Sequence, residues 1–574
     1  MDWLPPIENR GDTARGFGPG RAFRKAVLRN PKPPVLLRLL PCMTDMAFVM
    51  PLVFLFVGMK GAKTLLGDGD TGWHLRTGEW ILAHGRVPNQ DIFSFTRSGQ
   101  PWFAWEWLWD VVFGWLHLHF GMAAVLVASS TVLALTFALL FRLARSKSGD
   151  ALVALAATLV AAAGSTGHWL ARPHLFTMLF TVVFYTLLDR VDREDAARRL
   201  LWLLPPLMVV WTNLHGGFFV GILLIGGYAA GEFAVLFRET GAAERRAALE
   251  RGIRYSLAAG GCALASFVNP YFYHLHAHIL AYLSDGFFRG NITEFLSMNF
   301  QGGQARYFEI MLLAGGAAAF WYIRRGSLTW PLLFAVWAHL SLYSARNVEI
   351  FVLLAAPPAA EFVADAWRRA PALRWAGWLR RGLAGLRDFT QELSAFDAAP
   401  RWHAVSAVAV LALAAVFYAP RAPSEFRAEY DAKTYPAVAV GVMEKAGLFS
   451  GVFTPDLWGG YLIYREYPRV RVFMDGRSDF YGAEFAKQYI QAMGVQVGWE
   501  KYLARYGVDT IMLPPDAPLA GALKQSGAWH LIYDDGVALI FRSAQASALQ
   551  LQLPPANPSD GSKIASTYPK NKRL

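Results

Sequence analysis

The sequence predicts a polytopic α-helical membrane protein with a small α/β domain at its C-terminal end. Three observations support this prediction. The chain of 574 residues is 54% hydrophobic and 17% charged, whereas a soluble chain usually carries about 25% charged residues. Apolar runs that approach the roughly 20 residues needed to cross a bilayer recur in the first three quarters of the chain. After these runs, short strand-like and helix-like segments alternate.

About eleven apolar segments are predicted to cross the membrane. Two of them are weak, because 151–167 is rich in alanine and 201–212 contains Pro205 and Pro206. Proline is tolerated in a membrane helix where neighbouring groups satisfy the freed backbone carbonyl. The predicted spans are 43–64, 121–142, 151–167, 173–188, 201–212, 217–237, 255–268, 307–323, 328–344, 348–366 and 404–420.

Basic residues predict the orientation of these spans, because short cytoplasmic loops are enriched in lysine and arginine. The N-terminal arm, residues 1–42, is basic, and so is every second loop after it. These basic loops lie at 142–147, 190–199, 238–254, 324–325 and 368–401. The arm is therefore predicted to be cytoplasmic, and the chain after the last span external. Orientation accounts for the net charge of +12, so nucleic acid is not an expected partner.

The region 421–545 is predicted to be a compact external α/β domain that follows the membrane domain, residues 43–420. Its strands are expected within "GVFTPDLWGGYLIY", "VRVFMDGRSDFYG", "VDTIMLPP" and "WHLIYDDGVALIFRS", and its helices within "AEFAKQYIQAM" and "APLAGALKQ". The "DGRSD" at 475–479 is expected to be a turn, in which a structural role for Arg477 is at least as plausible as a binding one. Residues 546–574 are rich in proline, serine, asparagine and lysine and are predicted to be disordered.

Two patterns of residues that often bind metals are not predicted to form metal sites here. Cys42 and Cys262 lie far apart, in or beside apolar segments, and imply neither a disulfide nor a zinc site. The histidines of "HLHAH" at 274–278 alternate, a spacing that suits neither one helical face nor a metal site. The nearby tryptophan-rich "PWFAWEWLWD" at 101–110 is typical of an interfacial aromatic belt, which leaves the role of Glu106 open.

The first external loop, residues 65–105, opens with "GDGDTGWHLRTGEW", in which acids, a histidine and an arginine stand among glycines and tryptophans. Asp70 and His74 are four residues apart, so in a helix both side chains face the same space. Two interpretations stay open. Asp70 is either a functional acid or the N-cap of a helix that runs to Ala83 and stops at Gly85, and its pairing with His74 is either catalytic or structural.

Four further external turns carry polar side chains, and together with the first loop they converge on one face of the membrane. Ionisable residues at the ends of membrane helices are costly, which makes them functional candidates. These side chains are His168, Arg172 and His174; Asn213 and His215; Asn269, His274, His276, His278 and Glu294; and Arg346 and Asn347.

A substrate linked to a lipid phosphate fits this set of side chains. Arginines match the geometry of a phosphate with two parallel hydrogen bonds. A carboxylate close to the acceptor can act as a general base, or it can hold a divalent cation such as Mg²⁺ or Mn²⁺. Outside the cytoplasm there is no ATP, so an activated donor has to arrive attached to a lipid.

The first loop resembles that of the GT-C glycosyltransferase superfamily, which includes oligosaccharyltransferase catalytic subunits and protein mannosyltransferases. The resemblance rests on Asp70-x-x-Trp73-x-x-Arg76 followed by "DIFSFTRSGQPWF". It implies a helical membrane domain, an external active site and an external C-terminal domain, with Asp70 as the catalytic or metal-coordinating acid. The chain departs from oligosaccharyltransferases in having no WWDYG motif, and it has Arg172 and His174 where a second acid is expected.

These considerations predict an enzyme of the bacterial inner membrane with a cytoplasmic N-terminus and a periplasmic C-terminal domain. It is expected to move a sugar from a polyprenyl-phosphate carrier to a protein or glycan acceptor, in contact with membrane lipids. The catalytic candidates are Asp70, Glu294 and His74, with a divalent cation at Asp70 as the candidate cofactor, and the substrate-binding candidates are Arg76, Arg172, His174, Asn213, His215, Asn269 and Arg346.

Two other functions stay open from the sequence. A non-catalytic protein with the same fold would bind a lipid or a protein partner within a larger assembly. A ligase or polymerase of lipid-linked glycans would use the same external face. No feature of the sequence separates donor, acceptor or linkage.

Overall fold

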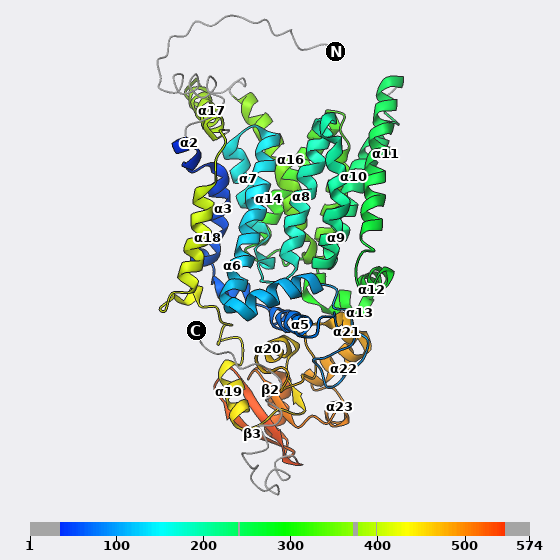
Figure 1. Cartoon of the computed structure of the whole chain (residues 1–574), viewed down its shortest axis with the longest axis vertical. Helices are drawn as coiled ribbons and strands as arrows, with labels where there is room; N and C mark the ends of the chain where they lie inside the picture. The colour runs from blue at the N-terminus through cyan, green and yellow to red at the C-terminus, as the bar shows by residue number, and fades with distance from the viewer. Residues whose placement is uncertain (1–34, 239–240, 371–376, 398, 546–574) are drawn as a thin grey trace, which may run out of the picture.

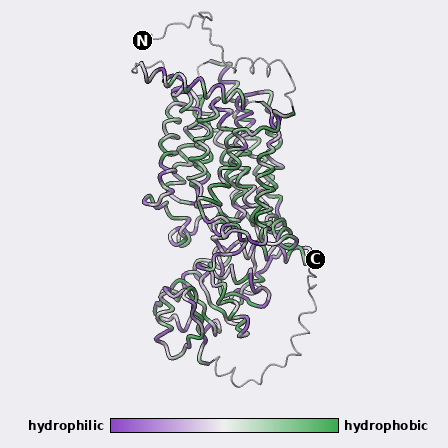
Figure 2. The backbone as a smooth tube through the Cα atoms, turned by 90° about the vertical axis from the view of Figure 1, so that its left-hand side faces the viewer, coloured by the Kyte–Doolittle hydropathy of each residue, from purple (hydrophilic) through white to green (hydrophobic). Residues whose placement is uncertain are grey.

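The computed structural model describes residues 35–238, 241–370, 377–397 and 399–545. Most of the predicted basic arm and the predicted disordered tail lie outside the described residues. Figure 1 shows a bundle of long helices, with a smaller region of short helices and strands below one end of it. Hydrophobic residues predominate along the middle of the bundle (Figure 2), as a membrane-spanning bundle requires.

A helix occupies each of the predicted apolar segments. They are α3 (Met43–Val53) with the π-helix η1 (Phe54–Gly58), α6 (Trp107–Ser148), α7 (Ala151–Gly164), α8 (His174–Arg193), α9 (Leu204–Leu214), α10 (Phe219–Val235), α11 (Ala242–Ala265), α14 (Ala305–Arg324), α15 (Thr329–Tyr343), α16 (Val348–Arg369) and α18 (Ala404–Phe417).

Length and composition identify fewer spans than the sequence predicts. Among the described residues, four helical stretches are long and apolar enough to cross a membrane: Trp107–Ser148, His174–Arg193, Gly216–Val235 and Ala345–Arg369. Three shorter apolar helices lie at Met43–Gly58, Ala151–Gly164 and Ala404–Phe417. The membrane character of the chain is thus supported, and the count of about eleven spans stays a prediction.

Helix α16 lies at the centre of the bundle. Every residue from Val348 to Ala360 is buried, and the helix packs against α6, α7, α8, α14 and α15. A helix that is apolar on all sides belongs inside a bundle rather than at its lipid face. Its first turn, which contains Glu349, and the 3-10 helix η6 (Ala345–Asn347) before it, which contains Arg346, therefore have fixed positions.

The first external loop forms helix α5 (Asp70–His84), which lies between the bundle and the lower region (Figure 1). Its end is the predicted one, since Gly85 adopts a left-handed conformation with φ of 66°. On one side α5 packs against the first part of α6, where a Cβ on Gly78 would overlap the carbonyl of Asp110. Gly121 then interrupts α6 with φ of 74°, at the residue where the predicted span begins.

The lower region contains a four-stranded sheet with the order β1-β2-β4-β3. β1 (Val452–Phe453) runs parallel to β2 (Thr510–Leu513), and β4 (Leu539–Ser543) pairs antiparallel with both β2 and β3 (Trp529–Asp534). The helices around it are α19 (Ala437–Lys445), α20 (Asp456–Glu466), α21 (Ser478–Tyr481), α22 (Ala483–Met493), α23 (Trp499–Arg505) and α24 (Pro518–Gln525). That 421–545 is an independent domain stays a prediction.

Of the predicted strand segments, the first contains β1 but mostly forms a helix, and the second forms no strand. The segment "DLWGGYLIY" forms α20, because Trp458, Tyr461 and Leu462 then bury one face at helical spacing. The segment "VRVF" forms only isolated bridges, in which Val472 pairs with Ser94 of the external loop and with Val452. The external loop thus extends the hydrogen bonding of the sheet and fastens the lower region to the bundle.

Candidate functional site

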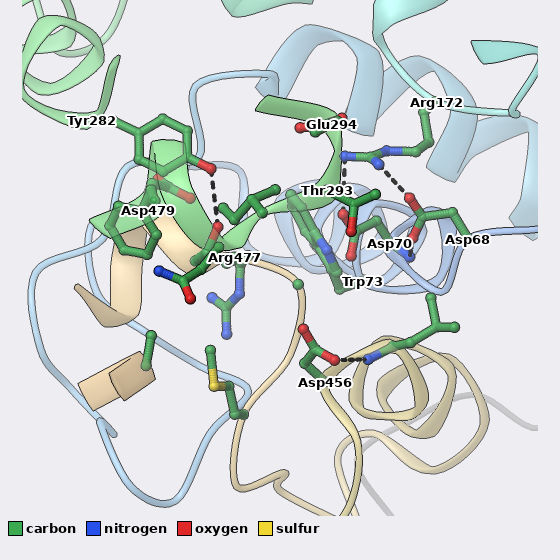
Figure 3. Close-up of a pocket in the computed structure, with 18 of the residues that line it drawn as sticks. Asp68, Asp70, Trp73, Arg172, Tyr282, Thr293, Glu294, Asp456, Arg477 and Asp479 are labelled. Atoms are coloured by element: carbon green, nitrogen blue, oxygen red, sulfur yellow. Dashed lines mark hydrogen bonds and ion pairs between the residues drawn. The ribbon is translucent and has the colours of Figure 1, made fainter. Parts of the chain in front are cut away.

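A cavity of about 540 Å³ lies where the bundle, the external loop and the lower region meet. Seven residues that the sequence analysis singled out line it, namely Asp70, Glu106, Arg172, His215, Glu294, Arg346 and Arg477. Three tryptophans, Trp73, Trp102 and Trp105, supply an aromatic wall. Figure 3 shows the charged side chains pointing toward this space from elements far apart in the sequence.

Asp70 is a buried acid that points into the cavity. The N-cap of α5 is Gly69, and the Asp70 carboxylate makes no capping hydrogen bond, so the interpretation of Asp70 as the N-cap is wrong. Its backbone N–H donates to Asp68 Oδ1 at 2.9 Å. Burial raises the pKa of Asp70 to about 7, and the nearby Asp68 carboxylate adds to this rise. Asp70 can therefore take up or release a proton near neutral pH.

Arg172 binds both acids of the first loop (Figure 3). Its Nη2 lies 2.9 Å from Asp70 Oδ2, and its Nη1 donates to Asp68 Oδ2. Pro173 follows at the N-cap of α8, which fixes where the guanidinium enters the cavity. The Nε of Arg172 is buried and has no hydrogen-bond partner among the described residues. One donor of the guanidinium therefore remains for an acceptor oxygen from a ligand.

Glu294 and Arg346 form a second ion pair at the cavity wall. Glu294 Oε1 lies 3.1 Å from Arg346 Nη1, and the guanidinium stands 5.2 Å from the ring centre of Phe295. The Arg346 charge lowers the pKa of Glu294 to about 2. Glu294 is therefore ionised at neutral pH, which suits a partner of arginine rather than a proton donor.

Glu106 contributes an acid whose role the sequence left open. Its Oε2 lies 3.4 Å from His74 Nε2 and its Oε1 3.4 Å from His215 Nε2. Burial raises the pKa of Glu106 to about 8, so the neutral acid predominates at pH 7. His74 is fully buried behind Trp73, with its Nδ1 2.7 Å from Asp110 Oδ1, and it does not line the cavity. His74 therefore contacts Glu106 without lining the cavity.

The "DGRSD" turn of the lower region forms the wall opposite Arg172. Gly476 lies so close to Asp70 that a Cβ at this position would overlap the Asp70 carboxylate. Arg477 donates to Asp475 at 2.7 Å and to Asp91 at 2.8 Å, both buried. These pairings agree with the structural interpretation of Arg477, because the ion pairs join the turn to the external loop.

Two residues of the lower region meet the membrane side of the cavity directly. Asp479 Oδ2 lies 2.9 Å from His278 Nε2, and Ser478 Oγ lies 3.0 Å from the Tyr282 hydroxyl. The sequence analysis did not select Ser478, Asp479 or Tyr282 as site residues. The available signal was an acidic turn after an apolar segment, but nothing local indicated which surface that turn would face.

Arg76 and His174 lie outside the cavity lining. Arg76 binds Glu79 at 2.6 Å and donates from Nε to the Tyr464 carbonyl at 2.9 Å, so it joins α5 to α20. His174 Nε2 donates to the His168 carbonyl at 2.5 Å, within the turn that begins α8. Both contacts shape the walls of the site, and a direct role in binding substrate stays a prediction for each.

Asn213 and Asn269 also lie outside the lining. The Asn213 side chain accepts from Trp107 Nε1 at 2.7 Å and donates to the Val268 carbonyl at 2.8 Å. The Asn269 amide donates to the Ser266 carbonyl at 2.9 Å, closing its own turn. Each side chain satisfies backbone or indole groups at a helix end, a use of asparagine that requires no substrate.

Asp70 belongs to no group of three closely spaced metal-ligating side chains in the described part of the chain. In the described part of the chain, one group of three such side chains has its ligand atoms within 4.8 Å of one another, and that group is Cys42, Asp45 and His403. At Asp70 the charge partner is the guanidinium of Arg172. A divalent cation bound to Asp70 would have to compete with that guanidinium, and most of its remaining ligands would have to be water or substrate oxygens.

No family model matches the chain, and no curated protein matches it. Among solved structures, the oligosaccharyltransferase AglB from Archaeoglobus fulgidus, in complex with an inhibitory peptide and a dolichol-phosphate, is similar with a TM-score of 0.50. That match has 11% identity and covers 93% of this chain and 75% of the other. ArnT from Cupriavidus metallidurans in the apo state gives a TM-score of 0.46 at 16% identity, over 87% of this chain and 96% of ArnT.

The likeness to AglB shows a fold of the kind that the predicted resemblance to GT-C glycosyltransferases implies. At identities this low, the structural similarity is informative about the fold and does not establish the activity.

Proposed function

We propose that this protein is a membrane glycosyltransferase that moves a sugar from a polyprenyl-phosphate-linked donor to an acceptor on the external face. The observation that carries the proposal is the buried Asp70, which faces the cavity beside the guanidinium of Arg172. The AglB-like fold supports it, because AglB was solved with a dolichol-phosphate and an inhibitory peptide.

Arg172 is the proposed contact for the donor phosphate. Its unpartnered Nε offers one hydrogen bond, and its Nη atoms can be shared between the acids and a phosphate oxygen. A guanidinium binds phosphate with a fork of donors that an ammonium lacks. Arg346, on the same cavity wall, adds a second positive charge near the leaving group.

Asp70 is the proposed general base. As the acceptor attacks the anomeric carbon, its proton passes to the Asp70 carboxylate and a new bond to that carbon forms. The bond from the anomeric carbon to the phosphate oxygen breaks, and its electron pair leaves with the lipid phosphate. Arg172 stabilises this charge. Glu106, protonated at neutral pH, is placed to donate a hydrogen bond to a sugar or phosphate oxygen.

Mg²⁺ or Mn²⁺ at Asp70 remains a prediction, and none of the steps above depends on it. The measurement is sugar transfer before and after treatment with a chelator. The acceptor class, the bacterial inner membrane and the periplasmic placement of the lower region likewise belong to this proposal.

One observation favours the alternative of a non-catalytic binding protein. Both cavity arginines already have anionic partners within the protein, since Arg172 binds Asp68 and Asp70 and Arg346 binds Glu294. A site that only binds a lipid or a protein partner would need no catalytic group. Lipid binding alone does not separate the two functions, whereas sugar transfer does.

The lipid contact is tested by the thermal stability of purified protein with and without polyprenyl phosphate. We expect the lipid to raise the Tm of the wild type, Arg172→Lys to keep only part of that rise, and Arg172→Ala to abolish it. Arg289→Lys, an exposed external arginine outside the lining, is the matched control and should respond as the wild type does. Arg172 variants that melt lower without lipid yet keep the full response would show that Arg172 is structural.

A further inference from the structure

A second polar cluster lies at the opposite end of the bundle from the cavity. Cys42 immediately precedes α3, Asp45 lies in its first turn, and His403 immediately precedes α18. These helices pack side by side, and both begin at the end away from the lower region (Figure 1). Cys42 and His403 are 361 residues apart in the sequence, which is why the sequence analysis predicted no metal site there.

The ligand atoms of this cluster lie within a few tenths of an ångström of the separations in a tetrahedral zinc site, with the two distances to Asp45 measured to different carboxylate oxygens. Cys42 Sγ lies 3.2 Å from Asp45 Oδ2 and 3.5 Å from His403 Nδ1, and His403 Nδ1 lies 3.4 Å from Asp45 Oδ1. Zinc bonds of about 2.3 Å to sulfur and about 2.0 Å to nitrogen and oxygen, at tetrahedral angles, place such atoms roughly 3.3–3.5 Å apart.

The donor set also selects among metals. Thiolate and imidazole are preferred by Zn²⁺, whereas Mg²⁺ and Ca²⁺ prefer oxygen ligands.

The surroundings hold the ligands in place. Ser406 donates to Asp45 Oδ1 at 2.6 Å, which orients the carboxylate. His403 has a φ of 52°, an uncommon conformation for a residue with a side chain, and it aims the imidazole at the cluster. Three arginines, Arg142, Arg145 and Arg401, line the adjoining cavity, and Arg145 is paired with Asp397. An adjoining cavity of about 520 Å³, lined by Cys42 and His403, provides an entry path.

We infer that Cys42, Asp45 and His403 bind one zinc ion, with a water molecule as the fourth ligand, and that the ion joins α3 to α18. Helix α18 leads directly into the lower region, so the ion would fix the position of the helix to which that region is connected. This inference does not depend on the proposed transferase activity.

The test is a titration of the purified full-length protein, freed of metal by chelation, with Co²⁺. We expect a near-ultraviolet sulfur-to-cobalt charge-transfer band that saturates at one ion per chain and disappears when Zn²⁺ is added. Cys42→Ser should lose the band, and His403→Gln should bind Zn²⁺ at least about tenfold more weakly. Cys262→Ser, which alters the other buried free cysteine, should behave as the wild type does.

Each variant is first shown to elute as the wild type does on size exclusion, so that loss of metal is not loss of the fold. A wild-type chain without the band overturns the inference, as does a Cys42→Ser chain that keeps it. An unchanged Zn²⁺ affinity in His403→Gln would remove the histidine from the ligand set and overturn the three-ligand site.

Discussion

At the scale of single residues, three charges decide the chemistry of the cavity. Arg172 carries one positive charge and faces two carboxylates, Asp68 and Asp70. A buried pair or triad of this kind is strongly destabilised when one member is removed, because the others are left uncompensated. Asp70 is the deeper of the two acids, and its raised pKa of about 7 makes it the member that exchanges a proton.

The pH dependence of transfer tests this assignment. A general base has to be deprotonated, so transfer should fall about tenfold per pH unit below a midpoint near 7. The Asp68 charge raises the pKa of Asp70. Asp68→Asn should therefore move the midpoint to lower pH, as measured from initial rates between about pH 5 and pH 9.

Asp516→Asn, an exposed acid of the lower region, is the control and should leave the pH profile unchanged. A midpoint that stays in place in Asp68→Asn, or that moves upward, contradicts the coupling between the two acids.

Sequence reasoning at this scale identified the acid but not its surroundings. Asp70 stood out because a polar cluster followed an apolar segment. Its partner Arg172 comes from a different loop, more than 100 residues away, and the closeness of Gly476 depends on how the lower region docks. Such contacts are set by tertiary packing, which local patterns do not encode.

At the scale of elements, glycines let α5 and α20 approach closely. A Cβ on Gly72 would lie 2.6 Å from the Gly460 carbonyl, and a Cβ on Gly460 would lie 2.6 Å from the Gly69 carbonyl. The pair Gly459-Gly460 lies within the segment "GVFTPDLWGGYLIY", in which a strand is predicted. In the structure these glycines instead serve the contact between two helices.

Gly460→Ala should lower the Tm of the purified protein. Alanine favours an isolated helix over glycine by about 1 kcal/mol, whereas overpacking a tight contact costs typically about 1–3 kcal/mol. The cost of overpacking should exceed the gain in helix propensity, because the overlapping atoms belong to backbone rather than to a flexible side chain.

The matched control is Gly441→Ala in α19, where an added Cβ meets nothing within 4 Å. It should melt at or above the wild-type temperature. A Gly460→Ala variant that also melts at or above that temperature would show that the approach of α5 to α20 is not tight.

At the scale of the whole molecule, the apolar segments and the alternation of basic loops predicted the helical bundle and its two ends. The fold is similar to that of AglB, and every predicted apolar segment contains a helix. The number of spans could not be derived from the sequence, because several of these helices are shorter or less apolar than a single membrane span requires.

The orientation is tested by reporter fusions. A fusion after Leu200, in a basic loop, should report a cytoplasmic location, and a fusion at Ser424, after α18, an external one. Paired reporters that are active on opposite sides of the membrane provide the control at each site. A cytoplasmic signal at Ser424 would change the number of spans by one and place the cavity on the wrong side for a lipid-linked donor.

The most direct test of the central claim is transfer of sugar from a radiolabelled polyprenyl-phosphate donor by the protein in proteoliposomes. Asp70→Asn keeps the size of the side chain and removes the base. We expect wild-type transfer to exceed that of Asp70→Asn by about 10²–10⁴-fold, while both proteins show the same Tm response to polyprenyl phosphate. A well-folded Asp70→Asn protein that transfers sugar at the wild-type rate would contradict the account.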